Sequence, residues 1–147
     1  GDRIICNYAR QLDGTGTVIL SVRQCPDLVP ALAVRAALRA GETTHIVDAA
    51  RLRLKESDRL EAVTAELNKL GAQVEQTPDA LIIHGVSRLH GGTCDSHGDH
   101  RIAMMLAVAA TCANGVVEVT GAESVAKSYP NFWEDYEQLG GTIARTE

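Results

Sequence analysis

The chain has 147 residues, 45% of them hydrophobic, which is enough to bury a real core and predicts a single domain. Its formal net charge of −5 and its aromatic content of 3% argue against a nucleic-acid binder, because such a protein needs a basic face and often stacks bases on aromatic rings. A small anionic ligand remains compatible, since a local basic pocket can form on an acidic protein.

The cysteines and the apolar runs bear on location. Four cysteines show neither a C-x-x-C pair nor the spacing of metal ligands, so we interpret them as reduced thiols of a cytoplasmic protein: Cys6, Cys25, Cys94 and Cys112. Cys112 follows an apolar run and is predicted to lie in the core. The run at 102–110 is too short to span a bilayer, and the first ten residues lack a signal-peptide pattern. Because the chain begins without Met, we expect it to be a piece of a longer protein.

A strand and a helix are the first predicted elements. β-Branched residues at 17–22 predict the strand, and the Pro-Asp pair at 26–27 ends it. The Ala- and Leu-rich run at 28–40 predicts a helix that stops at Gly41, a typical C-terminal glycine. Asp27 is expected at the N-cap of this helix, where its carboxylate would accept backbone N–H groups.

A second strand and helix follow, and then a hairpin. Residues 43–47 predict a strand, and apolar residues at helical spacing within 57–70 predict a helix that stops at Gly71. A Thr-Pro-Asp turn between 74–76 and 81–84 predicts two antiparallel strands.

The remaining residues continue the alternation. The patterns predict strands at 91–95, 116–120 and 142–144, and helices at 100–113 and 130–139. Strands that alternate with helices predict an α/β (α+β) fold with mixed sheets and buried helices.

An approximate repeat joins the two halves of the chain. A shift of 72 residues aligns four pairs of identical residues: Asp27 with Asp99, Ala31 with Ala103, Val47 with Val119, and Lys55 with Lys127. We therefore predict two copies of one structural unit, which bring charged residues of both halves to one polar site.

The stretch RLRLKESDR at 51–59 is the first candidate for that site. A helix start favours acids, so Lys55 and Arg59 near such a start are unfavourable unless an anion offsets them. A solvated helix end is the simpler alternative. Glu56, between two cations, would stay ionised, and it could transfer a proton once a substrate displaced its partners.

The segment Asp99-His100-Arg101 is the second candidate. It could be an N-cap with two surface residues behind it, but the very apolar run that follows predicts a buried helix, at whose mouth polar residues line a cleft. Arg101 could grip a carboxylate or a phosphate with two bonds. Asp27 is open to two roles, an N-cap and a general base, and Lys127 gains weight from its match with Lys55.

Four motifs together resemble the family of 5-enolpyruvylshikimate-3-phosphate (EPSP) synthase, also called 3-phosphoshikimate 1-carboxyvinyltransferase. They are PD at 26–27, LKESDRL at 54–60, GDHRIAM at 98–104 and AKSYPNFW at 126–133. The resemblance is loose before Gln24. It implies the enolpyruvyl transferase fold, in which two similar domains each contain three βαββαβ units. Residues 1–147 would then be the C-terminal part of the second domain, with about two of its three units.

The resemblance also implies an activity and its ligands. The family transfers the enolpyruvyl group of phosphoenolpyruvate to the 5-hydroxyl of shikimate 3-phosphate, without a metal or another cofactor. Its site lies in the cleft between the domains, so the partners of this chain would be the two substrates and the rest of the same enzyme. We expect the chain alone to have no turnover. Since one unit is missing, we also expect exposed apolar surface and self-association.

Family roles carry over to nine residues of this sequence. Asp27 and Glu56 match the catalytic base and acid. The predicted contacts to shikimate 3-phosphate come from Asp27, Lys55 and Arg51, although Arg51 stands where some members have Asn. The predicted contacts to phosphoenolpyruvate come from Arg59, Arg101 and Lys127, with His100 and Asp99 in support.

Two alternatives stay open beside this interpretation. One is the related enolpyruvyl transferase that acts on UDP-N-acetylglucosamine, against which the KESDR and DHR motifs weigh. The other is a non-catalytic module of the same fold. Such a module would be expected to have lost some of the charged site residues, and all of them are present.

Overall fold

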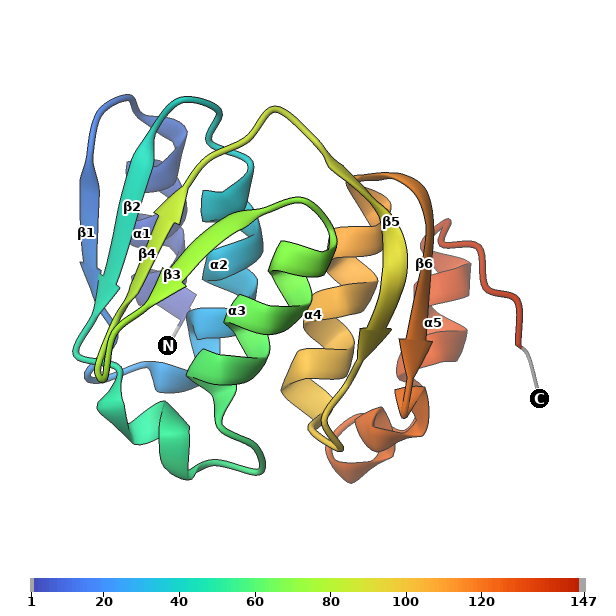
Figure 1. Ribbon diagram of the computed structural model, residues 1–147. Helices are drawn as coiled ribbons and strands as arrows, with labels where there is room; N and C mark the ends of the chain where they lie inside the picture. The colour runs from blue at the N-terminus through green and yellow to red at the C-terminus, as the bar shows by residue number, and fades with distance from the viewer. Residues whose placement is uncertain (1, 146–147) are drawn as a thin grey trace.

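A four-stranded mixed sheet forms one side of the computed structural model, which describes residues 2–145 (Figure 1). Its strands lie in the order β1 (Val18–Ser21), β2 (Thr43–Val47), β4 (Leu81–His84) and β3 (Gln73–Gln76). β1 and β2 are parallel, whereas β4 is antiparallel to both β2 and β3. The predicted hairpin is therefore confirmed, and its second strand inserts beside β2.

A second sheet has two parallel strands, β5 (Leu89–Asp95) and β6 (Ala113–Thr120). Between the two sheets lie α2 (Val29–Ala37), α3 (Arg59–Lys69) and α4 (His100–Thr111), as Figure 1 shows. The sheets therefore cover a central layer of helices, and the helices are buried as the sequence predicted.

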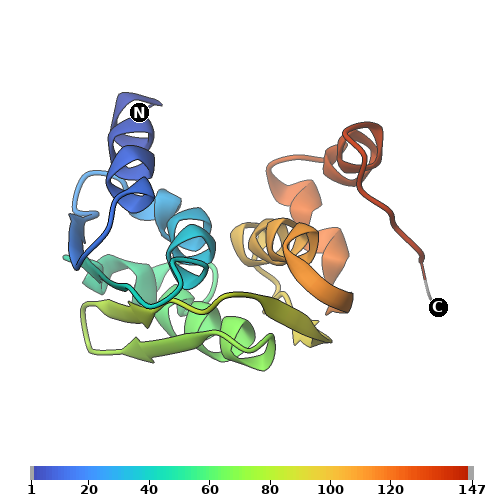
Figure 2. The ribbon, with the colours of Figure 1, turned by 90° about the horizontal axis from the view of Figure 1, so that it is seen from above.

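Two outer helices complete the described chain. α1 (Asp2–Asp13) contacts β1 and α2, and α5 (Phe132–Gln138) lies beyond the second sheet. Figure 2 shows that the N-terminal and C-terminal segments lie on opposite sides of the molecule. None of the helices within residues 2–145 is long and apolar enough to cross a bilayer.

The core is continuous across both units. Fully buried leucines and isoleucines of the sheet, such as Leu20 and Ile46, belong to one cluster with Leu67 of α3 and Leu106 of α4. Burial of each such side chain contributes about 1.5–3 kcal/mol, so packing of the helices against both sheets holds the two units together.

The predicted repeat is confirmed by the order of elements. Each unit has two parallel strands joined through a helix, then a short 3₁₀ helix, and then another helix. The 3₁₀ helices are η2 (Ala50–Leu54) and η3 (Ala122–Lys127). The units differ at one strand edge, because β2 also pairs with β4, whereas β6 pairs only with β5 among the described residues.

Several local predictions are wrong. Asp27 is not the N-cap of α2: it lies in a 3₁₀ helix, η1 (Pro26–Leu28), and α2 starts only at Val29 with Pro30 in its first turn. The segment 142–144 is not a strand, since it pairs with no described strand. Cys112 is exposed at the end of α4 rather than buried.

Other differences concern the ends of elements. α1 has no counterpart among the predicted elements. α3 starts at Arg59 with Asp58 as its N-cap, so Lys55 and Glu56 lie in the loop before the helix. Cys25 and Cys94 are free thiols, as predicted, while the side chain of Cys6 lies outside the described residues.

Candidate active site

Three loops bring the predicted site residues to one end of the molecule. They follow the carboxyl ends of the parallel strands β1, β2 and β5, and they lie at the lower end in Figure 1. The first loop carries Asp27, the second Lys55 and Glu56, and the third the start of α4. Parallel strands direct their carboxyl ends to the same edge, which explains why residues far apart in sequence meet here.

Asp27 is surrounded by cations from three segments. Its Oδ1 lies 2.9 Å from Nη1 of Arg59 and 3.8 Å from Nζ of Lys55, and its Oδ2 lies 4.0 Å from Nη2 of Arg101. The Asp27 side chain is 50% exposed, so a ligand can reach it. The sequence prediction that these four residues share one site is therefore supported by direct contacts.

Arg59 is the buried centre of the cluster, with a side chain only 2% exposed. Its guanidinium donates to both oxygens of Asp99 at 2.8 and 3.2 Å, to Glu56 at 2.5 Å and to Asp27 at 2.9 Å. Burial opposes the charge, but the hydrogen bond and charge of Asp99, with the charges of Glu56 and Asp27, more than offset it and raise the pKa of Arg59. Arg59 is thus a fixed cation that joins three carboxylates.

Asp99 anchors α4 to this cluster. It is fully buried, accepts from Ser57 Oγ at 2.7 Å, and caps α4 by accepting from the backbone N–H of Arg101 at 2.9 Å. Burial alone would raise the pKa of Asp99, but the hydrogen bonds from Arg59 and Ser57 and the nearby positive charge lower it. Asp99 therefore stays ionised and holds Arg59, Ser57 and the first turn of α4 together.

The start of α4 has unsatisfied polar atoms. Nδ1 of His100 and Nε of Arg101 are buried without a hydrogen-bond partner among the described residues. Such atoms are rare in folded proteins, and the positive end of a helix attracts anions. The start of α4 is therefore suited to an anionic group.

Lys127 and Arg51 differ in how closely they join the site. Lys127, at the end of η3, donates through Nζ to the carbonyl of Gly98 at 3.0 Å, which places it beside the loop before α4. Arg51 lies on η2 with an exposed side chain, and no ion pair or hydrogen bond joins it to another described residue. Its predicted contact with shikimate 3-phosphate stays a prediction.

Sequence reasoning missed two residues beside this site. Ser57 was not chosen, although it stands within the LKESDRL motif. Glu66 was overlooked too, although it falls on the inner face of α3, three residues after Val63. The carboxylate of Glu66 lies 2.8 Å from Nε2 of His97. A carboxylate at the spacing of buried apolar residues was the available signal for Glu66.

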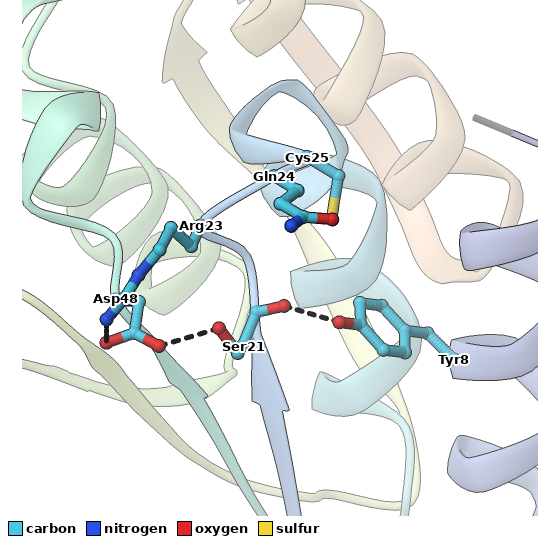
Figure 3. Close-up of a pocket in the computed structure, with 6 residues that line it drawn as sticks. All are labelled: Tyr8, Ser21, Arg23, Gln24, Cys25 and Asp48. Carbon is cyan, nitrogen blue, oxygen red and sulfur yellow. Dashed lines mark hydrogen bonds and ion pairs between the residues drawn. The ribbon is translucent and has the colours of Figure 1, made fainter.

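A cavity of about 320 Å³ lies next to the loop of Asp27 (Figure 3). It is lined by residues of α1, β1 and the turns that follow β1 and β2: Tyr8, Ser21, Arg23, Gln24, Cys25 and Asp48. Asp48 accepts from Ser21 at 2.6 Å and from Arg23 at 3.2 Å, and Tyr8 donates to the carbonyl of Ser21. None of the nine predicted site residues is among its lining residues. In the described part of the chain, no group of three His, Cys, Asp or Glu residues could hold a metal ion.

Comparison with known proteins identifies the family. The family model described as EPSP synthase (3-phosphoshikimate 1-carboxyvinyltransferase) matches residues 7–136. The chain belongs to the EPSP synthase family. A 3-phosphoshikimate 1-carboxyvinyltransferase from Clostridium acetobutylicum is 47% identical over 156 residues, which cover 97% of this chain and 36% of the relative. One from Clostridium kluyveri is 55% identical over 129 residues, which cover 88% of this chain and 30% of the relative.

Solved structures show the same fold. An EPSP synthase from Acinetobacter baumannii superposes with a TM-score of 0.78 and 36% identity, over 86% of this chain and 30% of that chain. The enolpyruvyl transferase NikO from Streptomyces tendae gives a TM-score of 0.72 and 26% identity, over 88% of this chain and 29% of that chain. The predicted enolpyruvyl transferase fold is confirmed, and this chain spans about a third of the length of its EPSP synthase relatives.

Proposed function

We propose that the enzyme containing this chain transfers the enolpyruvyl group of phosphoenolpyruvate to the 5-hydroxyl of shikimate 3-phosphate and releases phosphate. Membership of the EPSP synthase family supports the reaction. The carboxylate of Asp27 with Lys55, Arg59 and Arg101 around it is the single observation that carries it. A base surrounded by cations is what the reaction needs, since a hydroxyl must lose a proton beside two phosphorylated anions.

Binding would depend on charge-assisted hydrogen bonds from four cations. Arg101, Lys127 and the start of α4 would hold phosphoenolpyruvate, while Lys55 and Asp27 would hold shikimate 3-phosphate. Arg59 would add its remaining N–H group to phosphoenolpyruvate and hold Asp27 in place. Each hydrogen bond to a charged partner contributes roughly 1.5–3 kcal/mol, so a few of them can bind both substrates.

The chemistry would need one base and one acid. Asp27 takes the proton of the 5-hydroxyl, and the hydroxyl oxygen bonds to C2 of phosphoenolpyruvate while Glu56, in its acid form, gives a proton to C3. In the tetrahedral adduct the C2–O bond to phosphate then breaks. Phosphate leaves, C3 returns a proton to a carboxylate, and the enolpyruvyl ether remains.

This chain would form the C-terminal part of the second domain of the enzyme, and the rest of the enzyme would close the site. Its short share of the relatives' length supports the expectation that the chain alone has no turnover. We also propose a cytoplasmic location, which suits the free thiols of Cys25, Cys94 and Cys112.

Phosphate release by the full-length protein tests the proposal. With both substrates present we expect sustained release, and Asp27→Asn should slow it by about 10²–10⁴-fold because a general base is lost. Asp13→Asn, which changes an exposed carboxylate paired with Arg35, is the matched control and should keep the parent rate. Release with UDP-N-acetylglucosamine but not with shikimate 3-phosphate would show the related transferase instead.

A further inference from the structure

Glu66 is a buried carboxylate outside the nine predicted site residues. Its side chain is 2% exposed and lies on the inner face of α3. One oxygen accepts from the backbone N–H of Asp95 at 2.8 Å, the other lies 2.8 Å from Nε2 of His97, and Lys69 donates to both at 2.8 and 3.1 Å. Burial of a carboxylate is costly, so three partners indicate a specific role rather than packing.

Two of these partners come from the end of β5 and the loop between β5 and α4. Asp95 ends β5, and His97 occupies the left-handed region with φ of 57°, which is uncommon for a residue other than glycine. Gly98 follows with φ of 65°. Two successive left-handed residues turn the chain sharply into Asp99, and Glu66 contacts the first of them.

The same loop touches the site on its other side. Lys127 donates to the carbonyl of Gly98 at 3.0 Å, and the backbone N–H of Asp99 donates to the carbonyl of Ser96 at 3.0 Å. Ser96 is itself fixed by its hydroxyl, which donates to the carbonyl of Gly121 at 2.9 Å. A shift of His97 would therefore move the partner of Lys127 and the residue that caps α4.

We propose that Glu66 is a positioning residue for phosphoenolpyruvate binding, which acts through His97. Glu66 fixes the left-handed turn at His97, and the turn sets Arg101 and Lys127 at the distance that holds the anion. The proposal rests on the proposed function of the site. Shikimate 3-phosphate, assigned to Asp27 and Lys55, should depend less on this turn, because neither residue contacts it directly.

Substitutions of His97 in the full-length protein test the role. His97→Asn keeps a residue type that tolerates the left-handed region but is too short to reach Glu66, whereas His97→Gln restores the reach and a donor. Loss of a hydrogen bond to a charged partner predicts about a tenfold higher KM for phosphoenolpyruvate in His97→Asn, with the KM for shikimate 3-phosphate within about twofold. His97→Gln should recover most of the loss.

Lys69→Gln is the matched control, because it removes another partner of the same carboxylate without touching the loop. It should leave both KM values close to those of the parent. A rise of both KM values together in His97→Asn, or an equal effect of Lys69→Gln, would mean a general structural role and would overturn the proposal.

Hydrogen exchange separates this proposal from the proposed function. The backbone N–H of Asp99 should exchange faster in His97→Asn than in the parent or in Lys69→Gln. Unchanged exchange would overturn the positioning role even if the enzyme is active. If the parent does not transfer the enolpyruvyl group at all, the proposed function fails, and the faster exchange together with weaker direct binding of phosphoenolpyruvate would still support the positioning role.

Discussion

Arg59 already uses four of its five N–H groups on carboxylates of the protein itself. One N–H group remains for an incoming anion, so any second contact requires the anion to displace Glu56 or Asp27, while the buried pair with Asp99 remains in place. Glu56 can be displaced, because it lies in a loop and its side chain is 41% exposed. The contact between Arg59 and Glu56 thus links anion binding to the freeing of the proposed acid.

Replacement of Glu56 should separate binding from chemistry. In Glu56→Gln a neutral amide competes less strongly for Arg59, so the dissociation constant of phosphoenolpyruvate should fall by about fivefold, the difference between a charged and a neutral hydrogen bond. Turnover should fall by about 10²–10⁴-fold, because the proton donor is lost. Equilibrium titration and phosphate release measure the two effects.

Glu61→Gln is a suitable comparison for this change. Glu61 is an exposed acid of α3 that accepts a hydrogen bond from Gln76, and no hydrogen bond or ion pair joins it to Arg59. It should leave both binding and turnover unchanged. Weaker binding in Glu56→Gln would mean that Glu56 helps to hold the ligand rather than competing with it.

At the scale of elements, the helices and strands that the sequence predicted correctly are those with a clear local pattern of apolar or β-branched residues. α3 and α4 follow from apolar spacing, and the paired strands β1 and β2 of the first unit follow from β-branched runs. The strand at 142–144 failed because strand formation needs a partner, and no described strand pairs with it. Asp27 failed as an N-cap because its neighbouring residues form a 3₁₀ turn before α2.

The sequence predicted which residues form the site, but not which of these residues contact one another. The motifs identified the charged residues, yet Arg59 reaches Asp27 and Asp99 across 32 and 40 positions in the sequence. Which carboxylates an arginine joins depends on how the loops meet, and local spacing carries no such information. The pairing of Glu66 was missed for the same reason, since two of its three partners come from β5 and the following loop.

Asp99, the N-cap of α4, should make the stability of the fold depend on pH in the acid range. The pKa of Asp99 is lowered in the folded state, so its contribution to stability is fully present above the ordinary pKa of about 4 and is lost as the pH falls through the lowered value. Asp99→Asn should lose roughly 1.5–3 kcal/mol at neutral pH, because Arg59 loses its charged partner. Urea unfolding of parent and variant at pH 7 and at about pH 3 checks this.

The difference in free energy of unfolding between the two proteins should narrow at about pH 3, because Asp99 of the unfolded parent then binds a proton and this binding favours unfolding. Asp79→Asn, in the exposed turn between β3 and β4, serves as the control and should leave the free energy of unfolding unchanged at both pH values. A constant difference between parent and Asp99→Asn at both pH values would contradict the assigned role of the Asp99 charge.

At the scale of the whole molecule, the edge of β6 is the main difference between the two units. β2 pairs on both sides, whereas β6 pairs only with β5 among the described residues and is exposed along much of its length. Val116, on this strand, is 79% exposed. An open strand edge with apolar residues is a template for pairing with another chain.

We therefore expect the 147-residue chain to self-associate through β6. A lysine on this edge should oppose pairing, so Val116→Lys should raise the dissociation constant of the oligomer by about tenfold or more. Val108→Lys makes the same change at an exposed valine of α4, 45% exposed, and should have no effect. Sedimentation equilibrium over a range of concentrations measures all three proteins. A parent chain that stays at the monomer mass of 15.7 kDa throughout would show that the β6 edge does not pair, and equal weakening by both lysines would mean that charge alone, rather than the strand edge, controls association.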